Sequence, residues 1–315
     1  MPVTDRAGNS VDESHVTRRR VAAIGESQLV LSLFPGIDLL GRGFEDRGFA
    51  VVRGPDLIFG GDVRRFHSPS GRFDGVIAGP PCPDFSRARR GPPTGHGVQM
   101  LWEFQRVVME ASPDWWLLEN VPACPDVFIH GYSHQRIDID AHDLGAAQRR
   151  LRHFQFGHRR GFLLFLPRPS LGSGEACPTV LASELAGRAD FSRFCRLQGL
   201  PADFDLPGFT LAAKYRAVGN GVHVEVARFI AGAVLAPVPR SSIRLCACGC
   251  ARPVFGKARS AGPACRKRIE RKKRDAAGAA GTRPVTSCDG AGNAETRAVT
   301  SCDPARVARI RRVTP

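Results

Sequence analysis

The chain has 315 residues, with 45 Lys and Arg against 30 Asp and Glu, and a formal net charge of +15. Residues 240–315 hold 18 basic and 5 acidic residues, so this segment carries +13 and the preceding 239 residues carry only +2. These numbers indicate a nearly neutral globular body followed by a basic tail. The composition excludes collagen-like and wholly disordered proteins, and no apolar run approaches the ~18 residues of a membrane span.

The N-terminal segment and the cysteines indicate a reducing compartment. Residues 1–26 are polar, contain no apolar stretch of signal-peptide length, and are expected to be disordered. The ten cysteines are scattered through the body and bunched near the C-terminus. Without a secretory signal they do not suggest a disulfide framework, so we expect a cytoplasmic protein with no membrane partner.

Strands and helices are expected to alternate along the body. The apolar patterns predict strands in segments 28–35, 50–52, 74–79 and 115–120, and helices in segments 36–50, 99–110 and 222–235. Such alternation predicts crossover connections and a mainly parallel α/β sheet, whose ligands bind at the carboxyl ends of the strands. Segment 161–192 is rich in Pro, Gly and Ser, and we expect a loop-dominated insertion there.

Glycine and aspartate follow the first two strands. Phe34 and Gly36 come directly after the first strand, where glycine lets the backbone approach a ligand closely. Asp56 follows the second strand, where a carboxylate can bind ribose hydroxyls, and Asp62 is a weaker candidate. Taken alone, ordinary turn chemistry explains the glycine better, and a solvated turn aspartate explains Asp56 equally well.

A cysteine and a carboxylate follow the next two strands. Cys82 comes after two prolines, which stiffen the backbone that presents the thiol, although a lone cysteine is usually a small buried hydrophobe. Glu119 ends the neighbouring strand, and the pair suits covalent catalysis. Gln148, Arg150 and Arg152 then alternate in an extended segment, either as anion binders that orient the carboxylate or as a surface basic run.

Together these features resemble one family, the DNA cytosine-5 methyltransferases. The matching motifs occur in family order between residues 28 and 236: LSLFPGIDLLGRGFE (31–45), GPPCPDFS (79–86), LLENVP (117–122), AAQRRLR (146–152), CRLQGLPADF (195–204) and AVGNGVHVEVA (217–227). Six ordered matches are far more specific than any single one.

The resemblance implies a Rossmann-like methyltransferase fold that uses S-adenosylmethionine, with helices on both faces of the sheet. The catalytic domain would comprise residues 27–160 and 193–237, and segment 161–192 would be a short target-recognition insertion. The implied catalytic residues are Cys82, Glu119, Arg150 and Arg152, and the implied cofactor contacts are Phe34, Gly36, Asp56, Asp62 and Asn220. The implied reaction methylates carbon 5 of a flipped cytosine in DNA through a covalent cysteine adduct, and we expect a monomer with no identifiable protein partner.

The chain departs from the family pattern in three places. Pro83 stands where glutamine usually follows the catalytic cysteine, and Asp38 stands where glycine is usual in the first motif. Only about 40 residues separate Arg152 from the CRLQGLPADF motif (195–204), fewer than direct readout of the bases usually needs. Specificity is therefore short and relaxed, or another segment supplies DNA contacts.

The basic tail offers such a segment. Cys246, Cys248, Cys250 and Cys265 provide four thiols, enough for a tetrahedral structural zinc ion. The spacing lacks paired CxxC knuckles, so unliganded thiols in a disordered tail are the alternative. We interpret residues 241–275 as a zinc knuckle followed by a phosphate-binding helix, RKRIERKKR (266–274). Residues 276–315, in which RxVTSCD is duplicated, are expected to be a disordered tail.

Two other functions stay open at this point. A degenerate methyltransferase body could serve only to bind DNA, but intact Cys82, Glu119, Arg150 and Arg152 argue against decay. One branch of the family methylates tRNA, and no feature of the sequence selects RNA.

Overall fold

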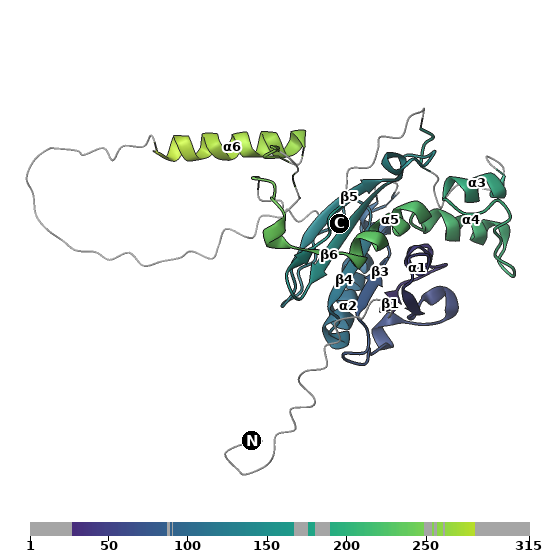
Figure 1. Ribbon diagram of the computed structural model, residues 1–315. Coiled ribbons are helices and arrows are strands. Elements are labelled where there is room, and N and C mark those ends of the chain that lie inside the picture. Colours follow the sequence, from purple (N-terminus) through teal and green to yellow (C-terminus); the bar gives the residue numbers. More distant parts are fainter. Residues whose placement is uncertain are drawn as a thin grey trace, which may run out of the picture. The chain divides into compact units, whose positions relative to one another are not determined.

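The described residues build a six-stranded sheet with the order β2-β1-β3-β4-β6-β5. The computed structural model describes residues 27–86, 89, 91–166, 176–179, 190–248, 254, 257–260 and 262–280. The strands of this sheet are β1 (Leu29–Leu33), β2 (Ala50–Arg53), β3 (Gly75–Ala78), β4 (Trp115–Asn120), β5 (Gln135–Asp140) and β6 (Leu151–His158), and Figure 1 shows their arrangement.

The four strands predicted from the sequence form the parallel half of this sheet. β1 lies between β2 and β3, and β4 pairs with β3, all in parallel register. β6 pairs antiparallel with β4, and β5 pairs antiparallel with β6. The predicted mainly parallel α/β sheet is thus confirmed, with an antiparallel pair at one edge that the apolar pattern did not reveal.

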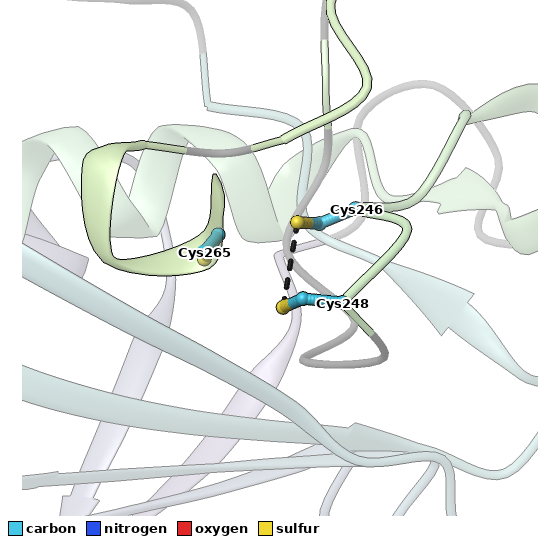
Figure 2. Close-up of side chains that lie close together, drawn as sticks. All are labelled: Cys246, Cys248 and Cys265. Atoms are coloured by element: carbon cyan, nitrogen blue, oxygen red, sulfur yellow. Dashed lines mark hydrogen bonds between the residues drawn. The ribbon is translucent and has the colours of Figure 1, made fainter. Parts of the chain in front are cut away.

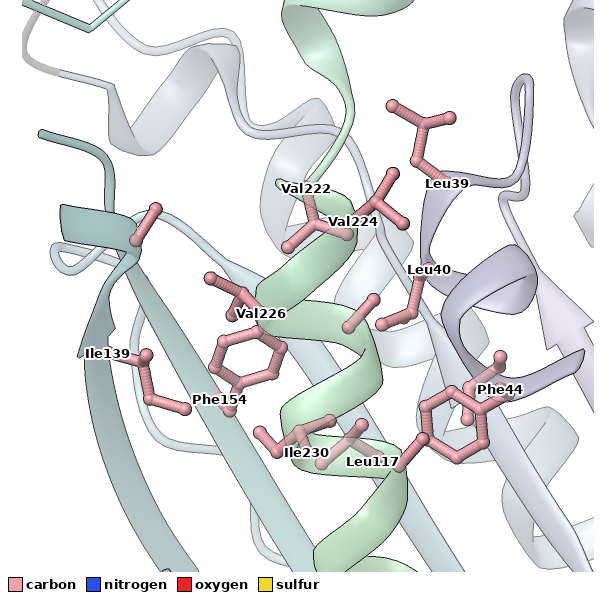
Figure 3. Packing of buried hydrophobic residues seen from close by; sticks show 14 of the residues in the cluster. Leu39, Leu40, Phe44, Leu117, Ile139, Phe154, Val222, Val224, Val226 and Ile230 are labelled. Carbon is pink, nitrogen blue, oxygen red and sulfur yellow. The ribbon is translucent and has the colours of Figure 1, made fainter. Parts of the chain in front are cut away.

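Helices cover both faces of the sheet because the central strands β1, β3 and β4 are buried on both sides. The main helices are α1 (Leu39–Glu45), α2 (His96–Ala111), α3 (Phe191–Leu197), α4 (Leu211–Asn220) and α5 (Val224–Leu235). On one face, α1 and α5 pack with Leu117, Ile139 and Phe154 of the sheet (Figure 3). On the other face, the buried side of α2 packs against alternate residues of β1, β3 and β4, including Leu31 and Trp116.

The contact between α1 and α5 joins the first predicted motif to the last. Gly43 of α1 faces Ala227 of α5 so closely that a Cβ at Gly43 would lie 2.3 Å from the alanine Cβ. Gly221, just before α5, approaches Leu39 in the same way, since a Cβ at Gly221 would lie 2.5 Å from Leu39 Cδ1. The two glycines let α5 pack closely against α1.

One apolar stretch, residues 211–235, has the length and hydropathy of a membrane span. In the structure it consists of two helices, α4 and α5, separated at residues 221–223. The inner face of α5 belongs to the core beside the sheet, which accounts for its apolar character.

Short elements complete the described chain. They are the 3₁₀ turns η2 (Leu57–Phe59), η3 (Val63–Arg65), η4 (Pro83–Phe85), η5 (Ala141–Leu144) and η6 (Arg240–Ser242), the strand pair β7 (Phe162–Leu163) and β8 (Val238–Pro239), and α6 (Pro263–Ala280). The chain divides into two compact units, residues 1–269 and 270–315, with the boundary inside α6.

Several predicted segments lie wholly or partly outside the described residues. They are segment 1–26, most of the 161–192 insertion, Cys250, and the duplicated motif within 281–315. The helix predicted over 266–274 is part of α6. α6 continues to Ala280, so residues 276–280 are helical where the sequence predicts a disordered tail.

Candidate active site

A cleft of about 310 Å³ opens at the carboxyl ends of β1, β3 and β4. Among the residues that line it are the predicted Phe34, Gly36, Asp56, Asp62, Cys82, Glu119, Arg152 and Asn220. Segments that are far apart in sequence therefore meet at one edge of the sheet, where ligands of parallel α/β sheets bind. Arg150 is the one predicted catalytic or cofactor-binding residue that does not line the cleft.

The loop after β1 has an unusual backbone. Phe34, Gly36 and Asp38 all have φ between 53° and 55°, the left-handed region. Glycine adopts this region freely, whereas it costs other residues about 1–2 kcal/mol. The loop thus alternates left-handed residues along the wall of the cleft, and contacts of the side chain offset the cost at Asp38.

Asp38 is the residue that stands where glycine is usual. Its Oδ1 accepts hydrogen bonds from Ser32 Oγ and from the Gly41 backbone N–H, both at 2.9 Å. Its Oδ2 lies 3.0 Å from Arg53 Nε. Burial raises the pKa of this carboxyl, and the hydrogen bonds and Arg53 oppose the rise. Asp38 therefore caps α1 from inside the fold, so the departure from the family pattern is structurally accommodated.

Asp56 ties the loop after β2 to the loop after β1. One carboxylate oxygen accepts from Gly36 N and the other from Ile58 N, each at 2.8 Å. Each carboxylate oxygen keeps a second lone pair, so Asp56 is still able to accept from a ligand hydroxyl. Asp62, farther along the cleft wall, forms a bidentate pair with Arg64 that lowers its pKa to about 2.

The loop that presents Cys82 is fixed at both ends. Asn120, at the end of β4, donates from Nδ2 to the Pro80 carbonyl at 3.0 Å. Asp84, two residues after Cys82, accepts from the backbone N–H groups of Thr94 and Gly97, both at 2.8 Å. The carboxylate of Asp84 thus anchors the cysteine loop to the N-terminal end of α2.

Pro83 and Asp84 follow Cys82 in this loop. Pro83 is the first residue of η4. A backbone N–H at this position would have no hydrogen-bond partner within the turn, so proline is tolerated there. Asp84 was not among the predicted site residues. An aspartate placed shortly before a helix is a common capping signal, and this signal was available in the sequence.

Cys82 and Glu119 both lie where negative charge is disfavoured. Burial raises the pKa of the Cys82 thiol, Glu119 adds to the rise, and Arg152 opposes it. Burial also raises the pKa of the Glu119 carboxyl, against Arg152, Arg150 and His153. The Glu119 side chain is 12% exposed, and its Oε1 lies 3.1 Å from Arg152 Nε. The site therefore combines a protonated thiol with a carboxyl that holds a proton more readily than usual.

Arg150 has a different position from Arg152. Its Nη2 donates to the backbone carbonyls of Gly219 and Gly221, at 2.7 and 2.6 Å. The side chain is almost fully buried. Through these two hydrogen bonds Arg150 positions the link between α4 and α5, and its part in catalysis stays a prediction.

Gln148 and Gln198 support the same link. Gln148 Nε2 donates to Gln198 Oε1 at 2.8 Å, and Gln198 Nε2 donates to the Val218 carbonyl at 2.7 Å. Gln198 belongs to the CRLQGLPADF motif (195–204) but was not among the predicted site residues. Together with Arg150, these amides hold the turn that carries Asn220 into the cleft.

The lining of the cleft suits a nucleoside-type cofactor. Phe34, Ile58 and Met100 offer apolar surface, while Asp56 and Asn220 offer hydrogen-bonding groups. Gly36 lies in this wall with a φ of 54°, a conformation that would be strained for a residue with a side chain. The donor set and the shape therefore fit S-adenosylmethionine.

Comparison with known proteins finds a family whose model matches part of this site. Residues 60–126 match the family model described as C-5 cytosine-specific DNA methylase. This range contains the Cys82 loop, α2 and the Glu119 strand, which form the reactive side of the cleft. This part of the chain is therefore similar to the C-5 cytosine-specific DNA methylases.

Curated relatives of this chain are bacterial. It is 33% identical over 105 residues to the type II methyltransferase M.HgiDI of Herpetosiphon aurantiacus, covering 30% of this chain and 33% of that protein. It is 27% identical over 164 residues to the type II methyltransferase M.NgoPII of Neisseria gonorrhoeae, covering 42% and 48%. The chain thus spans between a third and a half of the length of these relatives.

A solved structure shows the same fold. The crystal structure of an E. coli prophage protein, described as a DNA modification methyltransferase, aligns with a TM-score of 0.50 at 18% identity. The alignment covers 66% of this chain and 99% of that one. The Rossmann-like methyltransferase fold predicted from the sequence is thereby confirmed.

Proposed function

We propose that the protein is an S-adenosylmethionine-dependent DNA cytosine-5 methyltransferase. The observation that carries the proposal is the single cleft shared by Cys82, the Glu119–Arg152 pair, and the loops expected to hold the cofactor. A nucleophile, a proton donor and a methyl donor are the three components that this reaction requires.

The chemistry of cytosine explains the need for the thiol. Carbon 5 of the aromatic ring is too weakly nucleophilic to take a methyl group directly. Attack of the Cys82 thiolate on carbon 6 forms a C–S bond and moves the ring electrons toward carbon 5. After methylation, loss of the carbon 5 proton and cleavage of the C–S bond restore the ring and release the thiolate.

Glu119 and Arg152 act on the opposite side of the base. Because burial raises the pKa of Glu119, this carboxyl takes up a proton more readily than an exposed one and can share it with ring nitrogen 3 as negative charge develops there. Arg152 Nε, 3.1 Å from Glu119 Oε1, orients the carboxyl. Arg150 supports the cofactor side of the cleft through the backbone between α4 and α5.

The cofactor is expected on the β1–β2 side of the cleft. Phe34 and Gly36 would form its wall, Asp56 would accept from its ribose hydroxyls, and Asp62 and Asn220 would complete the polar contacts. When bound, S-adenosylmethionine supplies an electrophilic methyl group on a sulfonium.

The substrate is expected to be double-stranded DNA from which the target base is flipped. Carbon 6 of a stacked cytosine is inaccessible to a side chain, so the base must leave the helix to reach Cys82. Segment 161–192 would contribute the short recognition element. We further propose that the protein acts as a cytoplasmic monomer, in the setting of a restriction-modification or phage protection system.

The test is transfer of labelled methyl from S-adenosylmethionine to DNA by the full chain, with tRNA as a parallel acceptor. Methylated DNA at carbon 5, abolished by Cys82→Ser and by Glu119→Gln, is the expected result. Cys195→Ser is the matched control, because this buried thiol lies outside the cleft.

Three outcomes would contradict the proposal. Methylation that survives Cys82→Ser would exclude Cys82 as the nucleophile. Methylation of tRNA in place of DNA would change the substrate. Tight DNA binding without transfer to any acceptor would indicate a degenerate, DNA-binding protein.

A further inference from the structure

Three cysteine sulfurs outside the active site converge near the start of α6. Cys246 and Cys248 lie in the segment after η6, and Cys265 lies in the first turn of α6 (Figure 2). Their Sγ atoms all lie within 4.8 Å of one another, and those of Cys246 and Cys248 are 3.5 Å apart. All three side chains are only 2–3% exposed.

The separation of the sulfurs fits a shared metal ion better than a disulfide. A disulfide needs an S–S distance of about 2.05 Å, much shorter than the 3.5 Å between Cys246 and Cys248. Four ligands around a tetrahedral zinc ion, with Zn–S bonds of about 2.3 Å, lie roughly 3.8 Å from one another. The observed spacing brackets this value.

The described residues around these thiols form a small apolar cluster. Among them, Val254 and the partly buried Ile269 pack with the three cysteines. Two backbone hydrogen bonds, Ala247 N to the Arg259 carbonyl and Val254 N to the Arg244 carbonyl, cross-link the segment. Segments of this size usually depend on a metal or a disulfide for their fold.

We propose that Cys246, Cys248 and Cys265 bind one structural Zn²⁺ ion. Three thiolates form a soft donor set that favours zinc among the abundant divalent cations. The site carries net negative charge next to the first turn of the 18-residue helix α6, where the helix dipole stabilises it. Cys250, the fourth thiol of the sequence-based set, lies outside the described residues, and the proposal rests on the other three.

The ion would link the segment that contains Cys246 and Cys248 to the helix that follows. Residues 266–274 of α6, directly after Cys265, contain seven basic residues and one acidic residue. Zinc would therefore fix the start of a strongly basic helix whose charges suit contacts with phosphate. Metal binding is independent of the proposed methyl transfer, so either proposal can fail alone.

Metal analysis of the full chain, purified without chelators, tests the site. We expect one zinc per chain in the wild type and less than a tenth of that in Cys246→Ser, Cys248→Ser and Cys265→Ser. Cys177→Ser is the matched control and keeps its zinc, because this thiol lies outside the cluster. S-adenosylmethionine binding, unchanged in all four variants, shows that the catalytic fold is intact.

Cobalt and hydrogen exchange provide readouts that simple loss of packing would not move. Co²⁺ added to the metal-free chain is expected to give thiolate-to-metal charge-transfer absorption, which the three cluster variants lack. Removing zinc is expected to speed amide exchange at residues 244–269 and to leave the sheet unchanged. Zinc-free wild type that takes up no added zinc, zinc retained by all three cluster variants, iron in place of zinc, or a Cys246–Cys248 disulfide by mass spectrometry would overturn the proposal.

Discussion

At the residue scale, the charge on Cys82 depends on its charged neighbours, of which Glu119 and Arg152 have the largest effects. Glu119 raises the pKa of the thiol and Arg152 lowers it, on top of the rise caused by burial. The nucleophile is the thiolate, and its fraction increases tenfold per pH unit below the pKa. Turnover in the proposed reaction is therefore expected to depend on the balance between Glu119 and Arg152.

Alkylation of Cys82 as a function of pH measures this balance. Removing the carboxylate in Glu119→Gln should lower the thiol pKa and move the alkylation midpoint to lower pH. Removing the guanidinium in Arg152→Gln should move it to higher pH. The Cys82 peptide is followed by mass spectrometry with iodoacetamide, and identical midpoints in all three proteins, or shifts in the reverse directions, would contradict the assigned electrostatics.

The contact between Asp38 and Gly41 predicts a non-additive pair of substitutions. A Cβ at Gly41 would lie 2.2 Å from Asp38 Oδ2, so Gly41→Ala should destabilise the fold by about 1–3 kcal/mol. In an Asp38→Gly background the obstruction is gone, and the same change should be neutral or stabilising by up to about 1 kcal/mol, as alanine favours helix. Urea denaturation of the four proteins measures the cycle, and additive effects would show that Asp38 does not set the size limit at Gly41.

At the element scale, the link between α4 and α5 depends on side chains from distant segments. Arg150 and Gln198 donate to the carbonyls of residues 218, 219 and 221, on both sides of Asn220. These contacts convert an exposed turn into a fixed wall of the cleft. Disturbing them should therefore affect both stability and cofactor affinity.

Gln198→Leu tests this link. The substitution removes the hydrogen bonds that Gln198 makes with Gln148 and with the Val218 carbonyl, at an expected cost of about 1–3 kcal/mol in unfolding free energy. Weaker S-adenosylmethionine binding by calorimetry should accompany it, because Asn220 loses its fixed position. Gln105→Leu, on the outer side of α2, is the control and should change neither quantity appreciably; equal behaviour of the two variants would argue against the link.

The elements also show what the sequence could and could not predict. β1 to β4, α2 and α5 follow from apolar periodicity, and their order implies a cleft at the carboxyl ends of the strands. β5 reads QRIDID, where charged residues alternate with isoleucine at a sheet edge, and its antiparallel pairing depends on β6 rather than on local pattern.

Arg150 and Arg152 show which part of the site could not be predicted from the sequence. Arg150 and Arg152 are two residues apart in one motif, so the sequence assigns them similar roles. Their partners come from different parts of the chain, Glu119 for Arg152 and the Gly219–Gly221 turn for Arg150. Such a difference depends on tertiary packing, which a motif does not encode.

At the scale of the whole molecule, charge and chemistry lie in different parts of the chain. Residues 240–315 carry +13 of the net +15, while the residues around the cleft belong to the nearly neutral part. Sequence-independent contacts with phosphate release counterions, so they dominate affinity for DNA and its salt dependence. We therefore assign affinity to the basic segment and catalysis to the sheet.

Deleting residues 240–315 tests this division. Affinity for DNA should fall, and the slope of log Kd against log salt should become shallower, because fewer phosphates are neutralised. Turnover at saturating DNA should stay within a few-fold of the full chain. Binding is measured by salt titration, and a collapse of turnover at saturating DNA would show that the tail takes part in the chemistry.

The central claim, methylation of carbon 5 of cytosine by Cys82, is tested most directly by bisulfite mapping. DNA from cells that express the full chain is compared with DNA from cells that express Cys82→Ser. We predict protected cytosines in one fixed, short sequence context with the wild-type chain and none with the variant. Protection that persists in Cys82→Ser, or its absence with a wild-type chain shown to be expressed and folded, would contradict the account.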